Sequence, residues 1–382
     1  MLWGIGFTQD WKEWNSFMAS KRLKILVLKC CPNLRSTPDL SVFTQLKILS
    51  LAGCEELEHL HPSIGKLTSL VSLDLSQCGR LKELPEEVGE LKDLEELIFD
   101  GSGITEIPTS ICSLRKLKKL SFYSLWGSGS LREISSSIGD LQNLQHLDLE
   151  GSAIEKLPSE IGDLPSLQTL NIAETPISDL PESIRNLSSL QSLQLYYCDK
   201  LCSLPKLPLG LTNLVVRCQS PTLPQLSSLI HLKHLCLDHC HLLEDIPELS
   251  SRLLTLTIHE CDKLILLKLD RLEYLEHFYM RDCNSIERLD LSCLNHLKKL
   301  WVVNCNNLVE IQGPDRAKFL EPLDFMGCKS METWPDLNGC ERLQYVRVTN
   351  CKKLTQLRGF EKLDIITLII DYCDLLERTG LL

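Results

Sequence analysis

The sequence has no apolar run of the roughly 18 uncharged residues that a membrane-spanning helix requires. It also lacks a basic, apolar leader, because residues Met1 to Trp14 contain only a short apolar stretch that Asp10 interrupts. A secretory signal peptide is therefore not expected. We expect a protein that is made and kept in the cytoplasm, with the nucleus as an alternative location.

An excess of positive charge is also missing, because the sequence has 40 Lys and Arg residues but 51 Asp and Glu residues, for a net charge of -11. This balance argues against a nucleic-acid partner and against an anionic membrane surface, since both need a basic footprint. A phosphate-binding loop is absent too, because Gly65-Lys66 has no upstream glycine in register. With no local nucleophile-base group either, we expect no enzyme activity, no cofactor and no nucleotide site.

What the sequence does contain is one motif, Leu-x-x-Leu-x-Leu-x-x-Cys-x-x-Leu, in which other apolar residues replace Leu and Ser or Thr replaces Cys. The copies are 21 to 24 residues apart, except that the copy from Leu117 is 27 residues long. This period is typical of leucine-rich repeats. The sixteen copies start at Leu23, Leu46, Leu70, Leu94, Leu117, Leu144, Leu167, Leu190, Leu211, Leu232, Leu253, Leu275, Leu297, Leu320, Leu343 and Ile365.

The spacing within the motif predicts its structure. Two apolar residues separated by one point to the same face of a strand, so the Leu-x-Leu pair faces inward and the residues around it face outward. Because one repeat cannot bury its apolar face alone, the repeats must stack. The predicted fold is an α/β, curved leucine-rich-repeat solenoid of about 16 repeats, with a parallel inner sheet and short helices, 3₁₀ turns and loops on the outer face.

The outer path of the first half carries a second pattern. An apolar residue recurs every three positions, as in Ile161, Leu164 and Leu167, which suits a short helix or 3₁₀ turn. Prolines precede several of these segments, where a fixed φ and a missing N–H are harmless. These prolines are Pro85, Pro108, Pro158 and Pro181.

The 18 cysteines are explained mainly by the ninth motif position. A small side chain there faces inward, where its S–H or O–H can donate to backbone carbonyls of the turn. Cytosolic thiols are kept reduced, so we predict free thiols, although neighbouring-strand cysteines would be within disulfide reach. Eleven repeats have Cys at this position: Cys31, Cys54, Cys78, Cys198, Cys240, Cys261, Cys283, Cys305, Cys328, Cys351 and Cys373. Ser102, Ser152 and Thr175 replace it in three repeats, whereas Gln219 breaks the rule.

Two segments leave the pattern. Residues 1–22 precede the repeat domain of residues 23–382 and are either an N-terminal cap or the remnant of an upstream region. Residues 124–130 form a Gly/Ser-rich insertion around Trp126 that is either a contact point or a tolerated loop.

The run from Leu23 to Gly89 resembles the repeat region of plant intracellular disease-resistance receptors. These receptors combine a Toll/interleukin-receptor-like domain, a nucleotide-binding domain and C-terminal leucine-rich repeats. The most specific part is Cys31-Pro32-Asn33-Leu34 with Thr37-Pro38-Asp39 and then His61-Pro62-Ser63-Ile64-Gly65. Cys-x-x-Leu repeats extend the resemblance to about residue 373. The resemblance implies recognition of a pathogen effector, a guarded host protein or a signalling domain.

The outward positions differ between the two halves. In the first half they are small or acidic, whereas from Leu190 onward they gain aromatic, His and Arg residues. Tyr, Trp and Arg concentrate binding energy at interfaces, although strands favour Tyr and Trp in any case. We predict a protein-binding site on the concave face, formed by Tyr196, Tyr197, Arg217, His234, His239, His259, His277, Tyr279, Arg281, Trp301, Tyr345 and Arg347.

A zinc site is the alternative use of the histidines. His234, Cys236, His239, Cys240 and His241 lie close in sequence, but the repeat turns Cys240 inward and His234 and His239 outward. These ligands cannot converge into a tetrahedral set, so no metal is expected. The predicted function is a non-enzymatic recognition module of the immune-receptor type, and the alternatives are a stand-alone intracellular scaffold for signalling proteins or a ubiquitin-ligase adaptor.

Overall fold

A computed structural model describes residues 2–3, 21–313, 316–357 and 363–378. The chain forms two compact units, Met1–Asp199 and Lys200–Leu382. In the described residues, no helix combines the length and apolar character needed to cross a membrane. Most of the predicted N-terminal segment, residues 1–22, lies outside these ranges, but β1 (Leu2–Trp3) pairs in parallel with the first repeat strand.

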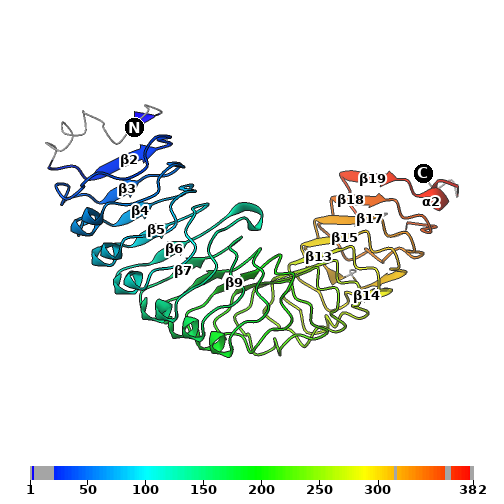
Figure 1. The fold of residues 1–382 in the computed structure, drawn as a ribbon. Helices are drawn as coiled ribbons and strands as arrows, with labels where there is room; N and C mark the ends of the chain where they lie inside the picture. The colour runs from blue at the N-terminus through cyan, green and yellow to red at the C-terminus, as the bar shows by residue number, and fades with distance from the viewer. Residues whose placement is uncertain (1, 4–20, 314–315, 358–362, 379–382) are drawn as a thin grey trace. The chain divides into compact units, whose positions relative to one another are not determined.

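The first unit is a stack of short parallel strands, each paired with the strand of the next repeat (Figure 1). Register is constant, since motif positions pair with their equivalents: Leu49 lies beside Leu73, and Leu73 beside Leu97. The repeat strands are β2 (Ile25–Lys29), β3 (Ile48–Ser50), β4 (Ser72–Asp74), β5 (Glu96–Ile98), β6 (Lys119–Ser121), β7 (His146–Asp148), β8 (Thr169–Asn171) and β9 (Ser192–Leu195).

The second unit repeats this parallel arrangement with mostly longer strands. A separate two-stranded sheet pairs β14 (Arg288–Asp290) with β16 (Glu310–Gln312), and α2 (Asp374–Arg378) follows the last strand. The main strands are β10 (Asn213–Val216), β11 (His234–Asp238), β12 (Thr255–His259), β13 (His277–Arg281), β15 (Lys299–Val303), β17 (Pro322–Met326), β18 (Tyr345–Thr349) and β19 (Thr367–Asp371). Each motif thus has its strand, and the predicted solenoid is confirmed.

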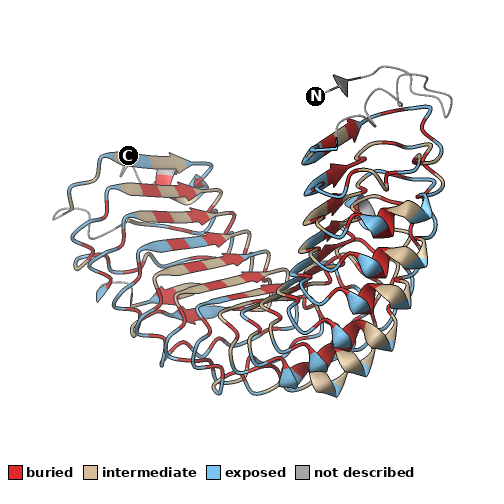
Figure 2. Cartoon of the chain, turned by 90° about the vertical axis from the view of Figure 1, so that its left-hand side faces the viewer, coloured by how far each residue is buried: buried red, intermediate tan, exposed pale blue. Residues whose placement is uncertain are grey.

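The core is built from the predicted inward positions. Leu235, Leu237 and Cys240 are buried, and so are their counterparts in nearly every other repeat. Figure 2 shows the alternation of buried and accessible residues along the strands. Full burial of one leucine stabilises the fold by roughly 1.5–3 kcal/mol, and neighbouring repeats supply this burial to each other.

The outer turns of the first unit are the predicted 3₁₀ helices. Pro85, Pro108, Pro158 and Pro181 stand immediately before four of them, with extended backbones and φ between -64° and -67°. The outer helices are η1 (Pro62–Lys66), η2 (Glu86–Glu90), η3 (Thr109–Ser113), η5 (Ser136–Asp140), η6 (Ser159–Asp163) and η7 (Glu182–Asn186), while η4 (Leu125–Gly127) lies in the insertion. The side chain of Trp126, in that insertion, lies outside the described residues.

Glycine allows these outer turns to stack closely. A Cβ atom on Gly89 of η2 would lie 2.5 Å from the backbone oxygen of Ser110 in η3. No side chain fits at that distance, so the repeats could not keep their spacing with a larger residue there.

The ninth-position thiols donate hydrogen bonds as predicted. The Sγ atom of Cys54 lies 3.1 Å from the carbonyl oxygen of Leu28 in the preceding repeat, and that of Cys198 lies 3.2 Å from the oxygen of Ile172. Burial raises the pKa of Cys54 and of Cys78 to about 12. The repeat from Leu211 departs from the pattern as predicted, because Gln219 at the ninth position is only half-buried and the buried thiol is that of Cys218, one position earlier.

The eighth motif position is a turn residue with a left-handed backbone. Its φ is positive in both units, at glycines such as Gly53 and Gly151 and at larger residues such as Tyr197, His239 and Glu260. Left-handed backbone is costly for residues with a Cβ atom. The eighth position therefore has a structural role in addition to its outward direction.

Candidate functional site

The twelve predicted binding residues divide between the two units. Tyr196 and Tyr197 belong to the first unit, where their rings meet edge to face at 4.4 Å. The other ten belong to the second unit. Nine of them lie on the open face, which we define as the sheet face formed by side chains at motif positions three, five and seven, and His239 stands at the eighth position. Six of these ten surround one hollow, namely His259, Tyr279, Arg281, Trp301, Tyr345 and Arg347.

This hollow, which we call the slot, has a volume of about 770 Å³. Strand register explains it, because Tyr279, Trp301, Asp324 and Arg347 stand in one row across β13, β15, β17 and β18. The side chain of Asp324 is much shorter than those of Trp301 and Arg347, so a hollow forms at β17 between these two larger side chains. Volumes of roughly 300–1,000 Å³ are usual for binding pockets.

The aromatic wall of the slot is held by ring contacts. The rings of Tyr279 and Trp301 meet edge to face with centroids 5.1 Å apart, and His277 stacks beside Tyr279 at 6.3 Å. Trp301 is nevertheless 45% exposed. A large apolar side chain that is both fixed and half-exposed matches the residues that dominate protein interfaces.

The floor of the slot is Asp324, which sequence reasoning missed. Its Oδ2 atom lies 3.6 Å from Nη1 of Arg347, and its buried Oδ1 atom has no hydrogen-bond partner among the described residues. Burial raises the pKa of Asp324, although the charge of Arg347 acts in the opposite direction. A buried acceptor of this kind favours a ligand that brings an N–H or O–H group.

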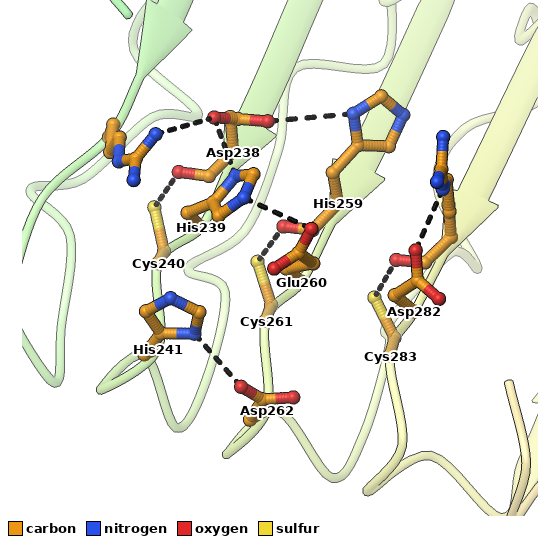
Figure 3. A network of polar contacts seen from close by, with 12 residues as sticks. Asp238, His239, Cys240, His241, His259, Glu260, Cys261, Asp262, Asp282 and Cys283 are labelled. Atoms are coloured by element: carbon orange, nitrogen blue, oxygen red, sulfur yellow. Dashed lines mark hydrogen bonds and ion pairs between the residues drawn. The ribbon is translucent and has the colours of Figure 1, made fainter. Parts of the chain in front are cut away.

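A second group of predicted residues lies around another missed acid, Asp238, which is fully buried at the end of β11 (Figure 3). Its Oδ2 atom lies 2.8 Å from Nδ1 of His239 and 3.6 Å from Nη1 of Arg217, and its Oδ1 atom lies 3.5 Å from Nδ1 of His259. Burial alone would raise the pKa of Asp238, but His259, His239 and Arg217 outweigh it and lower this pKa. Asp238 stands at the outward seventh position, but its contacts with Arg217, His239 and His259 accompany its full burial there.

The Asp238 group fixes side chains that sequence reasoning assigned to binding. Nε2 of His239 lies 3.0 Å from Oε1 of Glu260, so both ring nitrogens face carboxylate oxygens. Both can donate at once only when the ring is protonated. Arg217, His239 and His259 are thus positioned by a buried charge, and only His259 also lines the slot.

The remaining predicted residues, His234 and His277, lie on the open face beside these two groups. Residues at the same motif position pair across β11, β12 and β13, which places Thr255 between them. Burial and the charge of Lys299 lower the pKa of His277. A neutral His277 at pH 7 can both donate and accept a hydrogen bond.

The open face of the first unit carries acidic side chains instead. Several of them already make hydrogen bonds with neighbouring residues. Asp100 accepts hydrogen bonds from the Ser121 hydroxyl and the Tyr123 backbone N–H. Burial raises the pKa of Asp148 to about 6, with a further contribution from Glu150, although a hydrogen bond from the backbone of Glu150 opposes it.

Sequence reasoning also missed a stack of exposed side chains at the position before each motif. Tyr274 stacks on His296 at 5.4 Å, His296 lies 6.2 Å from Phe319, and the guanidinium of Arg342 lies 5.2 Å from the Phe319 ring centroid. His231 and Arg252 hold the same position in the two preceding repeats. The recurrence of aromatic, His and Arg residues at this one position was the sequence signal that could have revealed the stack.

The candidate zinc ligands stay apart as the register implies. Cys240 is buried, where its Sγ atom lies 3.7 Å from the Asp238 carbonyl oxygen, whereas His241 pairs with Asp262 at 2.9 Å (Figure 3). Among the residues that the structure describes, no group of three or more His, Cys, Asp or Glu side chains is placed to hold a metal ion.

Comparison with known proteins agrees with this geometry. The model of the family described as "Leucine-rich repeat region" matches residues 25–132 and 128–216, about half of the chain. No curated protein matches the sequence. This chain belongs to the leucine-rich repeat region family, whose solenoids typically serve as protein-interaction scaffolds.

Several solved structures share the fold. A leucine-rich repeat protein of Leptospira interrogans is 20% identical, with 97% of this chain and 96% of that chain covered and a TM-score of 0.57. The functional domain of InlJ from Listeria monocytogenes, described as including a cysteine ladder, is 20% identical, with 91% and 67% covered and a TM-score of 0.61. TLR13, solved in complex with ssRNA13, is 16% identical, with 96% and 60% covered and a TM-score of 0.66.

Proposed function

We propose that this chain is a non-enzymatic protein-recognition module of the plant immune-receptor type, acting in the cytoplasm. Its partner would be a pathogen effector, a guarded host protein or a signalling domain. The resemblance of residues 23–89 to the repeats of plant disease-resistance receptors supports the receptor type. The open face of the second unit would make the contact.

The slot is the observation that carries the proposal. It joins a fixed, half-exposed Trp301 to two accessible guanidinium groups, those of Arg281 and Arg347, whose side chains are 61% and 40% exposed. Aromatic and Arg side chains in a hollow are the usual anchors of protein interfaces. Residues Tyr196 and Tyr197 are proposed as contacts on the first unit by their chemistry alone.

Quantitative affinity capture from plant extract tests the proposal. The wild-type chain is compared with a Tyr279→Ala plus Trp301→Ala variant and with an Ile48→Ala plus Ser72→Ala variant, which alters the open face of the first unit. We expect at least one protein that the wild type and the first-unit variant retain and the second-unit variant loses. Equal capture by all three folded chains would contradict the assignment.

A stand-alone scaffold for signalling proteins is the second candidate. The exposed stack of Tyr274, His296, Phe319 and Arg342 favours it, because this stack offers a contact surface in addition to the open face. A scaffold would hold two partners at once. Capture of two proteins, one lost in the slot variant and the other lost in a Tyr274→Ala plus Phe319→Ala variant, would favour the scaffold over a receptor module.

A further inference from the structure

We propose that the slot binds one short segment of the partner protein, in which an Asp or Glu residue stands next to a bulky apolar residue. This inference rests on the proposed function and adds the chemistry that the partner must present. The segment must supply three groups: an anion, an apolar side chain and an N–H donor. Each of them is complementary to one feature of the slot.

The anion is required by the charges that line the slot. Arg281, Arg347 and His259 are basic, and Asp324 is the single acid among the lining residues that the structure describes. Arg281 also pairs with Asp282, and His259 with Asp238, so Arg347 is the cation on which the anion site depends. Asp324 faces Arg347 at 3.6 Å, which leaves the rest of this exposed guanidinium open to a second carboxylate. Arg side chains bind carboxylates through two parallel hydrogen bonds, so a carboxylate fits here better than a neutral or cationic group.

The apolar side chain is required by the walls. Trp301 stands on β15 and Tyr345 on β18, on either side of β17. The slot is also lined by Val303 on β15 and by Pro322 and Met326 on β17. A bulky apolar residue placed there would cover the exposed part of Trp301 and gain roughly 25 cal/mol for each Å² of apolar surface removed from water.

The N–H donor is required by Oδ1 of Asp324. This oxygen is buried and has no hydrogen-bond partner within the described part of the chain. A bare anion brings no donor for this carboxylate, whereas a peptide carries backbone N–H groups beside its own carboxylate side chain. The hydrogen bond requires the Asp324 side chain to turn Oδ1 toward the slot. A peptide segment therefore fits the slot better than a free organic acid.

Selection from a random library of 12-residue peptides on the full chain tests this inference. We expect enrichment of Asp or Glu beside Trp, Phe, Tyr, Leu or Ile. The best peptide should bind about 10-fold more weakly when its acid is changed to the amide, the effect of one charge-assisted hydrogen bond. The same exchange should have little effect on binding to an Arg347→Gln variant, because the partner charge is then missing.

A Thr255→Ala variant is the control, since Thr255 lies on the same face but does not line the slot, and it should bind the peptide as the wild type does. Selection of basic peptides, absence of selection, or equal binding by a Trp301→Ala variant with unchanged thermal unfolding would overturn the inference. So would competition by N-acetyltryptophan as strong as by the peptide, since it would indicate a small-molecule pocket. If capture of a partner depends on Tyr279 but no acidic peptide binds, this inference fails and the proposed function still holds.

Discussion

Nδ1 of His239 lies 2.8 Å from Oδ2 of the buried Asp238, the residue before it in the chain. We expect Asp238→Asn to lower the free energy of unfolding by about 3–5 kcal/mol, because breaking a buried ion pair leaves Arg217 and two histidines without their shared counter-charge. Urea unfolding followed by circular dichroism measures the loss.

Asp262→Asn is the matched control for this substitution. Asp262 also pairs with a histidine, His241, but its side chain is 51% exposed. Exposed ion pairs contribute about 1 kcal/mol or less, so this variant should unfold close to the wild type. Equal losses in the two variants would show that burial of Asp238 does not matter.

Asp148 should make the stability of the fold depend on pH with the opposite sign from an ordinary paired acid. Its pKa is about 6 in the folded chain against 3.8 ordinarily, so between these values the folded state binds a proton that the unfolded state does not. Stability should therefore fall as pH rises from 4 to 6 and stay low above pH 6. Asp148→Asn should remove this slope and raise stability at pH 7 by about 1–3 kcal/mol. An unchanged slope in urea midpoints between pH 4 and 7 would count against it.

The sequence predicted the architecture because each inward position repeats with one chemistry. Leu235, Leu237 and Cys240 could be placed from the motif alone, and the prolines located four outer turns. The missed features depend on neighbouring repeats. Asp238 is buried because Arg217 and His259 lie at the same motif position in the adjacent repeats, a column of base, acid and base that the sequence did contain.

The slot was less accessible to sequence reasoning. Its depth depends on side-chain size across three strands, with Asp324 between Trp301 and Arg347. Single-strand patterns identify an outward residue but not a hollow. The glycines at the eighth position, such as Gly53 and Gly151, were a readable signal for the left-handed turn.

Thiol reactivity should follow burial. Cys30 and Cys202 are exposed, whereas most of the 18 cysteines are buried, several with a pKa raised to about 12 by burial and neighbouring groups. Because the thiolate is the reactive form, we expect about two thiols to react rapidly with Ellman's reagent in the native chain and all of them in guanidinium. Rapid reaction of ten or more thiols in the native chain would contradict the burial of most cysteines.

Glycine at an eighth-position residue should stabilise the fold. Gln77 has a φ of 58° and an exposed side chain whose amide makes one long hydrogen bond of 3.4 Å. Gln77→Gly removes the cost of a left-handed backbone and should raise stability by up to about 1 kcal/mol. Gln45→Gly, at an exposed turn position with no positive φ, should instead lower stability. A loss in both variants by thermal unfolding would refute the turn assignment.

The central claim is that a protein partner contacts the open face of the second unit. Photo-crosslinking tests it most directly, with p-benzoylphenylalanine in place of Trp301 in β15 or of Ile98 in β5, since both stand at motif position five. The account predicts that irradiation with the captured partner gives a covalent product at position 301 and none at position 98. A product at position 98 alone would contradict it.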